Sequence, residues 1–109
     1  MRRLVPREEA GPWVGDGRVA IRYLAPIPRP WHTFEVRVNG REHAGFVRVS
    51  DTGARVSTVR VIAWDGRGMH QVARRRVQVV GPTRDACEQL RAIVGEPALY
   101  SRIVLGMGG

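Results

Sequence analysis

One long stretch decides the fold. Residues 34–80 read FEVRVNGREHAGFVRVSDTGARVSTVRVIAWDGRGMHQVARRRVQVV. Apolar and polar residues alternate along it, as they do in strands with one buried face. Three turn sequences divide these runs, namely Asn39-Gly40, Asp51-Thr52-Gly53 and Asp65-Gly66. Because such turns join neighbouring strands directly, the stretch predicts an antiparallel meander.

The first of these turns also predicts how its two strands pair. A two-residue type I′ turn at Asn39-Gly40 would place Val36 opposite His43 and Arg37 opposite Glu42. A slip by one residue would mix the two faces, so the turn and the alternation favour the same register. One apolar face is then expected to hold Phe34, Val36, Val38, Val47 and Val49.

The flanking segments extend the meander into an α+β domain. Thr83 suits a helix N-cap, Gly95 suits the position after the helix, and Pro97 prevents continuation, so a helix is expected over 83–94. The apolar run 98–105 predicts a last strand. The expected fold is α+β, with one helix packed on a meander sheet of about five to six strands at 18–24, 33–38, 41–50, 55–64, 68–80 and 98–105.

Residues 18–105 are expected to form this single domain. Residues 1–17, with two prolines and scattered charge, predict a flexible basic N-terminal arm, and 106–109 a disordered tail. The start of the chain lacks a signal-peptide pattern, and no apolar run reaches membrane-spanning length. The single cysteine, Cys87, fits a reducing compartment. These features predict a cytoplasmic protein with no membrane partner.

The formal net charge is +8, and every one of the 18 basic residues is arginine. GC-rich coding would explain part of this excess, but it does not explain why Asp and Glu together number only 10. A field of this sign attracts polyanions whatever its origin. Nucleic acid, DNA or RNA, is therefore the expected partner.

The densest charge is Arg74-Arg75-Arg76 in the last strand of the meander. Arg74 and Arg76 should point the same way about 7 Å apart, a spacing that suits consecutive phosphates. The predicted nucleic-acid-binding residues are Arg74, Arg76, Arg75, Arg60, Arg48, Arg2 and Arg3. The helix face holding Arg84, Glu88 and Arg91 is nearly neutral and is not expected to bind nucleic acid.

Sequence motifs for catalysis are missing: the chain has no phosphate-binding loop, HExxH, CxxC or GxSxG. His32, His43 and His70, together with Glu35, Arg74 and Arg76, supply the residue types of a metal-free ribonuclease, which is the minor hypothesis. No catalytic residue, metal ligand or cofactor is assigned. Cys87 is expected to be a buried core residue.

Two function classes remain open from the sequence. The first is a small nucleic-acid-binding module that uses an arginine-bearing sheet face. The second is a phage or mobile-element accessory or assembly protein that acts through protein contacts. The apolar C-terminal strand at 99–105 would leave an edge for a second copy to cover, so a homodimer is expected.

Overall fold

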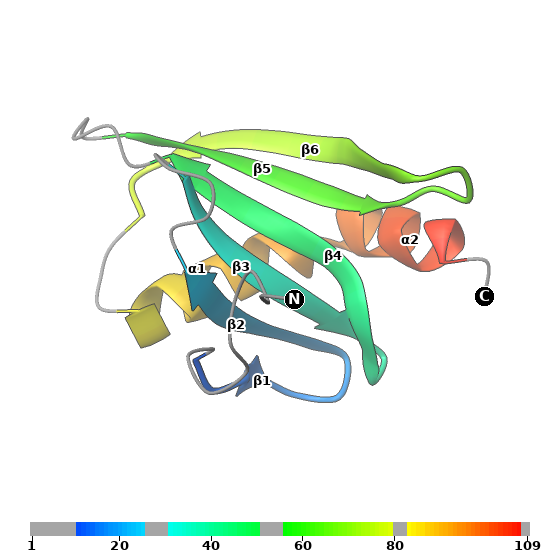
Figure 1. Cartoon of the computed structure of the whole chain (residues 1–109), viewed down its shortest axis with the longest axis horizontal. Coiled ribbons are helices and arrows are strands. Elements are labelled where there is room, and N and C mark those ends of the chain that lie inside the picture. The colour runs from blue at the N-terminus through cyan, green and yellow to red at the C-terminus, as the bar shows by residue number, and fades with distance from the viewer. Residues whose placement is uncertain (1–10, 26–30, 51–55, 80–82, 108–109) are drawn as a thin grey trace, which may run out of the picture.

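The computed structural model describes residues 11–25, 31–50, 56–79 and 83–107. The chain order is β1 (Val14–Gly15), β2 (Val19–Ala25), β3 (Trp31–Val38), β4 (Arg41–Ser50), β5 (Ser57–Trp64), β6 (Met69–Val77), α1 (Thr83–Val94) and α2 (Pro97–Gly106). The strands form an antiparallel sheet in sequential order, and both helices lie on one of its faces (Figure 1). The predicted α+β meander is confirmed, and the expected helix over 83–94 is α1.

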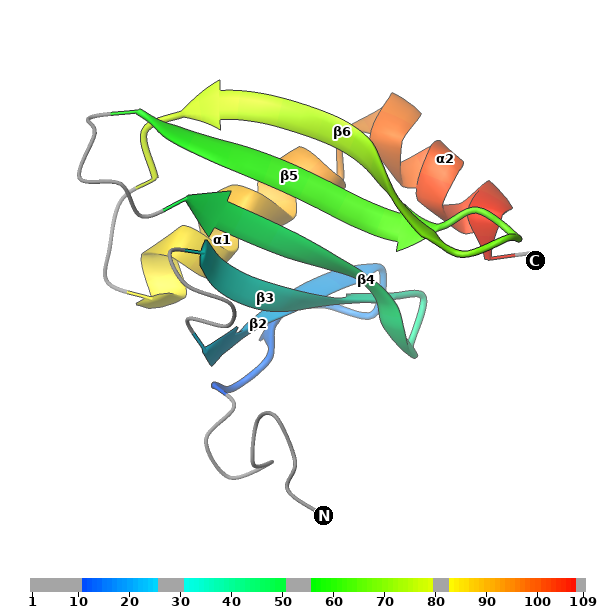
Figure 2. The same ribbon diagram turned by 45° about the horizontal axis from the view of Figure 1, so that its top comes forward.

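The face of the sheet that carries the helices, called the helix face, holds the core. Figure 2 shows α1 behind the strands and α2 following it at the β6 edge of the sheet. Leu90 of α1 and Ile103 of α2 are almost fully buried, and so are Val36, Val47 and Val61 of the strands. The five residues predicted to share an apolar face all lie in this core: Phe34, Val36, Val38, Val47 and Val49.

The β3–β4 hairpin has the predicted turn but a different register. Positive φ angles at Asn39 (52°) and Gly40 (79°) match a type I′ turn, and Val38 pairs with Arg41 as expected. Val36, however, pairs with Gly45. The predicted Val36–His43 pair and the Arg37–Glu42 pair are therefore wrong.

A bulge in β4 causes this shift. His43 takes a positive φ of 61°, so β4 bends and its register relative to β3 moves by two residues. A shift of two residues leaves every later side chain on its original face, because strand side chains alternate with a period of two. The predicted faces survive for that reason, while His43 becomes exposed rather than facing the core.

The C-terminal segment is a helix, so the predicted strand over 98–105 is wrong. Pro97 does end α1, but a proline also suits the first turn of a new helix because its φ is already helical. Leu99 and Ile103, four residues apart, are buried against the core. The homodimer hypothesis rested on a strand edge here, and this segment does not offer one. Neither described helix is long and apolar enough to cross a membrane.

The N-terminal part of the sheet begins earlier than the sequence pattern indicated. Strand β1 pairs with β2 through Val14 opposite Ile21 and Gly15 opposite Ala20. Part of the expected arm therefore belongs to the sheet. The rest of it, residues 1–10 with Arg2 and Arg3, lies outside the described residues, and so does the predicted turn at 51–53.

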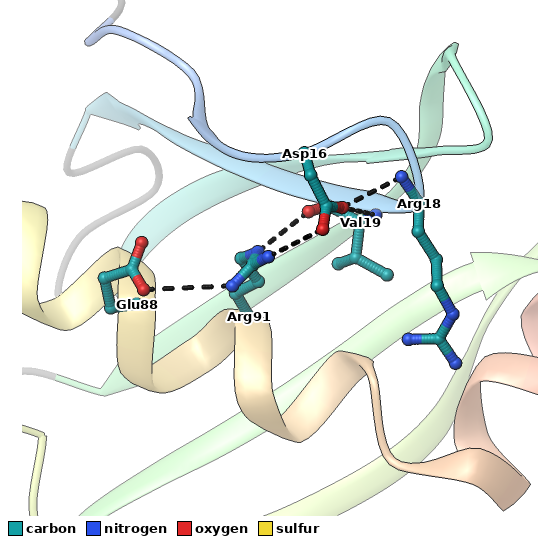
Figure 3. A network of polar contacts seen from close by, with 5 residues as sticks. All are labelled: Asp16, Arg18, Val19, Glu88 and Arg91. Carbon is teal, nitrogen blue, oxygen red and sulfur yellow. Dashed lines mark hydrogen bonds and ion pairs between the residues drawn. The ribbon is translucent and has the colours of Figure 1, made fainter.

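A polar clamp joins α1 to the turn between β1 and β2 (Figure 3). Asp16 accepts hydrogen bonds from the backbone N–H of Arg18 and Val19, and its Oδ2 lies 3.0 Å from Nη2 of Arg91. Nε of Arg91 donates to the Val19 carbonyl at 2.9 Å, and Glu88 lies 3.8 Å away. The two backbone N–H groups, and then Arg91, lower the pKa of Asp16. Arg91 is thus a structural residue and not only the surface partner of Glu88.

Candidate nucleic-acid interface

The face of the sheet turned away from the helices, called the open face, is rich in arginine. Because strand side chains alternate, every second residue of β2 to β6 points to the open face, and the buried valines between them point to the helix face. Each of these five strands contributes at least one guanidinium. The six arginines of the open face are Arg22, Arg37, Arg48, Arg60, Arg74 and Arg76.

Three of these residues stand directly opposite one another across β4, β5 and β6. Arg48 pairs with Arg60, and Arg60 pairs with Arg74; we call these three residues the arginine row. Like charges in opposing positions destabilise a sheet, and neighbouring strands are only about 4.8 Å apart. Arg76, opposite Thr58, lies about 7 Å further along β6. The structure thus places Arg48 and Arg60 on the same face as Arg74 and Arg76, the two residues that the alternation predicted to point the same way.

Glu35 of β3 places a carboxylate on the open face. The Glu35 side chain is 1% exposed. Its Oε1 accepts from Nε of Arg22 at 2.9 Å and lies 2.7 Å from Nη2. Its Oε2 is next to Nδ1 of His43, although the two are not aligned for a hydrogen bond. This carboxylate is therefore already engaged at the β2–β3 side of the sheet.

Arg48 has a donor that the described residues do not use. Its Nε is buried and has no hydrogen-bond partner among the described residues. A buried donor without a partner is costly, and because this atom has almost no accessible surface, a ligand oxygen would reach it only after the side chain moved. A guanidinium with spare N–H groups is also the side chain best shaped to bind a phosphate in bidentate fashion.

Arg75 is separated from the other predicted site residues. It pairs with Val59, so it points to the helix face, where its Nη2 donates to Glu96 at 2.9 Å. Its Nη1 donates to the backbone carbonyl of Arg74 at 3.0 Å. Arg75 therefore ties β6 to the start of α2. Arg2 and Arg3 lie outside the described residues, so their place relative to the row stays a prediction.

Apolar side chains border the arginine row on the same face. They were not among the residues predicted from the sequence to form the site. Phe46 stands opposite Ile62, and Trp64 stands opposite Met69. Trp64 is 43% exposed. In the sequence, Ile62 and Trp64 alternate with the buried residues of β5, which indicates that they share a face. That they lie beside Phe46 and Met69 follows only from the register of the neighbouring strands.

A tryptophan from the N-terminal segment covers the other side of the open face. The Trp13 ring lies 4.6 Å from the guanidinium carbon of Arg22 and 4.6 Å from that of Arg37. These contacts are cation–π stacks. Arg22 of β2 therefore contacts both Trp13 and Glu35, and Arg37 of β3 contacts Trp13. The arginine row lies on the neighbouring strands β4 to β6.

The histidines do not share a site. His32 contacts the Tyr23 hydroxyl at 3.0 Å, His70 lies 3.5 Å from Asp65, and His43 lies beside Glu35. Within the described ranges, no cluster of three or more His, Cys, Asp or Glu residues could hold a metal ion. Cys87 is buried, and burial raises the pKa of its thiol to about 11.

Comparison with known proteins does not add to this description. No family model matches the chain, and neither does any curated protein or solved structure. The chemistry of the open face is thus the basis for a function.

Proposed function

We propose that this protein is a small nucleic-acid-binding module that uses the open face of its sheet. The observation that carries the proposal is the arginine row, in which Arg48, Arg60 and Arg74 face one another in register across three strands. A phosphate backbone lying across these strands would relieve the repulsion between the guanidinium groups. It would also supply acceptors for their N–H groups.

The distribution of charge supports the same proposal. Several described acidic residues serve structural contacts away from the row: Asp16 in the clamp on α1, Glu96 beside Arg75, and Asp65 in the turn after β5. Solvated arginines that only increased solubility would not need to face each other across a sheet, because alternating signs would serve stability better.

The test is a salt titration of oligonucleotide binding, followed by fluorescence anisotropy. The double variant Arg60→Gln with Arg74→Gln removes two of the three charges of the row and keeps most of the aliphatic stems. Each phosphate contact releases about 0.7 counterion from a single strand and about 0.9 from duplex DNA. The slope of log K against log salt should therefore fall by about 1.4 or about 1.8, respectively.

The matched control removes two arginines from the helices, by Arg84→Gln and Arg102→Gln. Both residues are exposed, and the double change lowers the net charge by the same amount. It should leave the slope nearly unchanged. Nη1 of Arg102 donates to the Val72 carbonyl at 3.1 Å, so urea unfolding must first show that this control is as stable as the wild type. Arg91 does not suit this control, because its clamp on Asp16 and Val19 makes it a structural residue.

Two outcomes would contradict the proposal. If both double variants lose affinity equally, binding follows net charge and the row is not a site. If the wild type shows no salt-sensitive binding to DNA or RNA near 0.1 M salt, the nucleic-acid function fails. The alternative of an accessory or assembly protein acting through protein contacts would then take its place.

A further inference from the structure

We infer that the nucleic acid bound by the open face is single-stranded, with its bases stacked on the apolar side chains beside the arginine row. This inference rests on the proposed function and names the class of its ligand. The observation behind it is that charged and apolar side chains of the open face are sorted into neighbouring rows.

Following β5 along the open face shows this sorting. Arg60 lies in the arginine row, Ile62 comes next with Phe46 on one side and the polar Gln71 on the other, and Trp64 follows opposite Met69. Alternate residues of a strand are about 7 Å apart, so the row of charges and the two apolar rows lie side by side within about 14 Å. We call the four residues Phe46, Ile62, Trp64 and Met69 the apolar rows.

Two residues of the apolar rows are exposed to solvent. A protein that bound only phosphates would have no use for exposed apolar side chains beside its arginines. Trp64 and Met69 are 43% and 38% exposed. A base that is not paired presents a flat aromatic surface, which stacks on such side chains while its phosphate reaches the neighbouring guanidinium. In a duplex the same surfaces are hidden within the base stack.

The width of the sheet also disfavours binding within a duplex groove. The major groove is about 12 Å wide and admits one helix or a two-stranded ribbon. Strands β2 to β6 span about 19 Å at the usual spacing, and β5 has hydrogen-bonded neighbours on both sides at Arg60. The arginine row therefore lies on a broad surface, over which a single strand can run but which cannot enter a groove.

A hollow at the end of the apolar rows gives room for a base next to Trp64. It forms where β4 bends away from β5, has a volume of about 170 Å³, and is lined by Arg41, His43, Ala44, Trp64, Met69 and Met107. The lining combines the Trp64 ring and two thioethers with the polar side chains of Arg41 and His43, and Nη1 of Arg41 already donates to the Met107 carbonyl at 3.1 Å. Such a lining suits a flat heterocycle with hydrogen-bonding groups on its edge.

The test compares 20-nucleotide probes by anisotropy at one salt concentration: oligo(dT), oligo(U) and a DNA duplex of equal length. The wild type should bind a single strand at least tenfold more tightly than the duplex. The two single-stranded probes separate DNA from RNA, and they differ in the 2′-hydroxyl group and in the methyl group of thymine. Trp64→Leu should weaken single-strand binding about 5- to 150-fold, the range for loss of one stacking partner, while the salt slope stays unchanged.

Two further variants accompany this measurement. Trp64→Phe keeps an aromatic ring and should retain most of the affinity, which separates stacking from a loss of folding. Leu105→Ala is the matched control, because Leu105 is a 77% exposed apolar residue on α2. It should bind like the wild type.

The outcomes separate this inference from the proposed function. Equal or tighter binding of the duplex, with the slope still dependent on the arginine row, would overturn the single-strand inference and leave the proposed function standing. The same affinity for Trp64→Leu and Leu105→Ala would also overturn it, because the bases would then lie elsewhere. Absence of binding to all three probes would overturn both.

Discussion

Replacement of Glu35 by alanine should be one of the most destabilising single changes on the open face. The Glu35 side chain is 1% exposed and the Arg22 side chain is 17% exposed, so the pair they form at 2.7 Å is largely removed from water. Removing one partner of a buried pair leaves the other charge without compensation, at a cost of about 3–5 kcal/mol. Arg22 keeps some access to solvent and stacks on Trp13, which places the expected loss near the lower end, about 3 kcal/mol.

The corresponding change in melting temperature follows from the size of the domain. At about 2.1 cal/mol/K of unfolding entropy per residue, a chain of 109 residues loses about 13 °C for 3 kcal/mol. Urea unfolding at pH 7, followed by circular dichroism, measures the free energy directly. Raising the salt concentration should change the difference little, because buried pairs are poorly screened.

Two comparisons make this result decisive. Glu42→Ala removes an exposed carboxylate from the same hairpin and should change the free energy of unfolding by no more than about 0.5 kcal/mol. The double variant Glu35→Leu with Arg22→Met replaces both charges by apolar groups and should recover much of the loss. If Glu35→Ala were as mild as Glu42→Ala, the carboxylate would not be held in a buried pair, and this reasoning would be refuted.

Two other predictions follow from the titrating groups. The pKa of Asp16 is lowered in the folded state, so its stabilising contribution is fully present above the unfolded pKa of about 3.9 and is lost as the pH falls through the lower folded value. The urea midpoint should therefore drop on acidification below pH 4, and less steeply in Asp16→Asn; identical pH profiles for the two proteins would contradict this. The pKa of Cys87 is raised to about 11, so its contribution is present below about pH 8.5 and is lost as the pH rises toward 11. At pH 8 a thiol reagent should label native Cys87 only as fast as the protein opens, and rapid labelling without urea would show that the thiol is accessible.

Much of the fold could be predicted because several signals agreed. The helix over 83–94 combined an N-cap, an apolar stripe and a terminating glycine, and the structure has the same bounds. The β4 bulge carried no such signal, because His43 takes a positive φ without being glycine. The last helix was missed because Pro97 both ends α1 and begins α2, and a short apolar run fits either a strand or a helix.

Only part of the candidate site could be predicted from the sequence. Alternation along one strand was enough to place Arg74 and Arg76 together and to separate them from Arg75. The arginine row could not be deduced, because it depends on the register of β4 against β5 and of β5 against β6 at once. Glu96 could not be connected with Arg75 from the sequence either, since 21 residues separate the two partners of this contact.

The arginine row is best understood as a place where local stability conflicts with the rest of the sheet. Three other described arginines pair with acidic residues: Arg22 with Glu35, Arg75 with Glu96 and Arg91 with Asp16. A sequence selected for folding alone would gain from an acidic residue opposite Arg48 or Arg74, since opposite charges across strands stabilise a sheet and like charges destabilise it. Folded proteins tolerate such conflicts mainly at functional sites, where a ligand resolves them. Under the proposed function, a chain of phosphates would resolve this one, because it would bring negative charges that span all three strands at once.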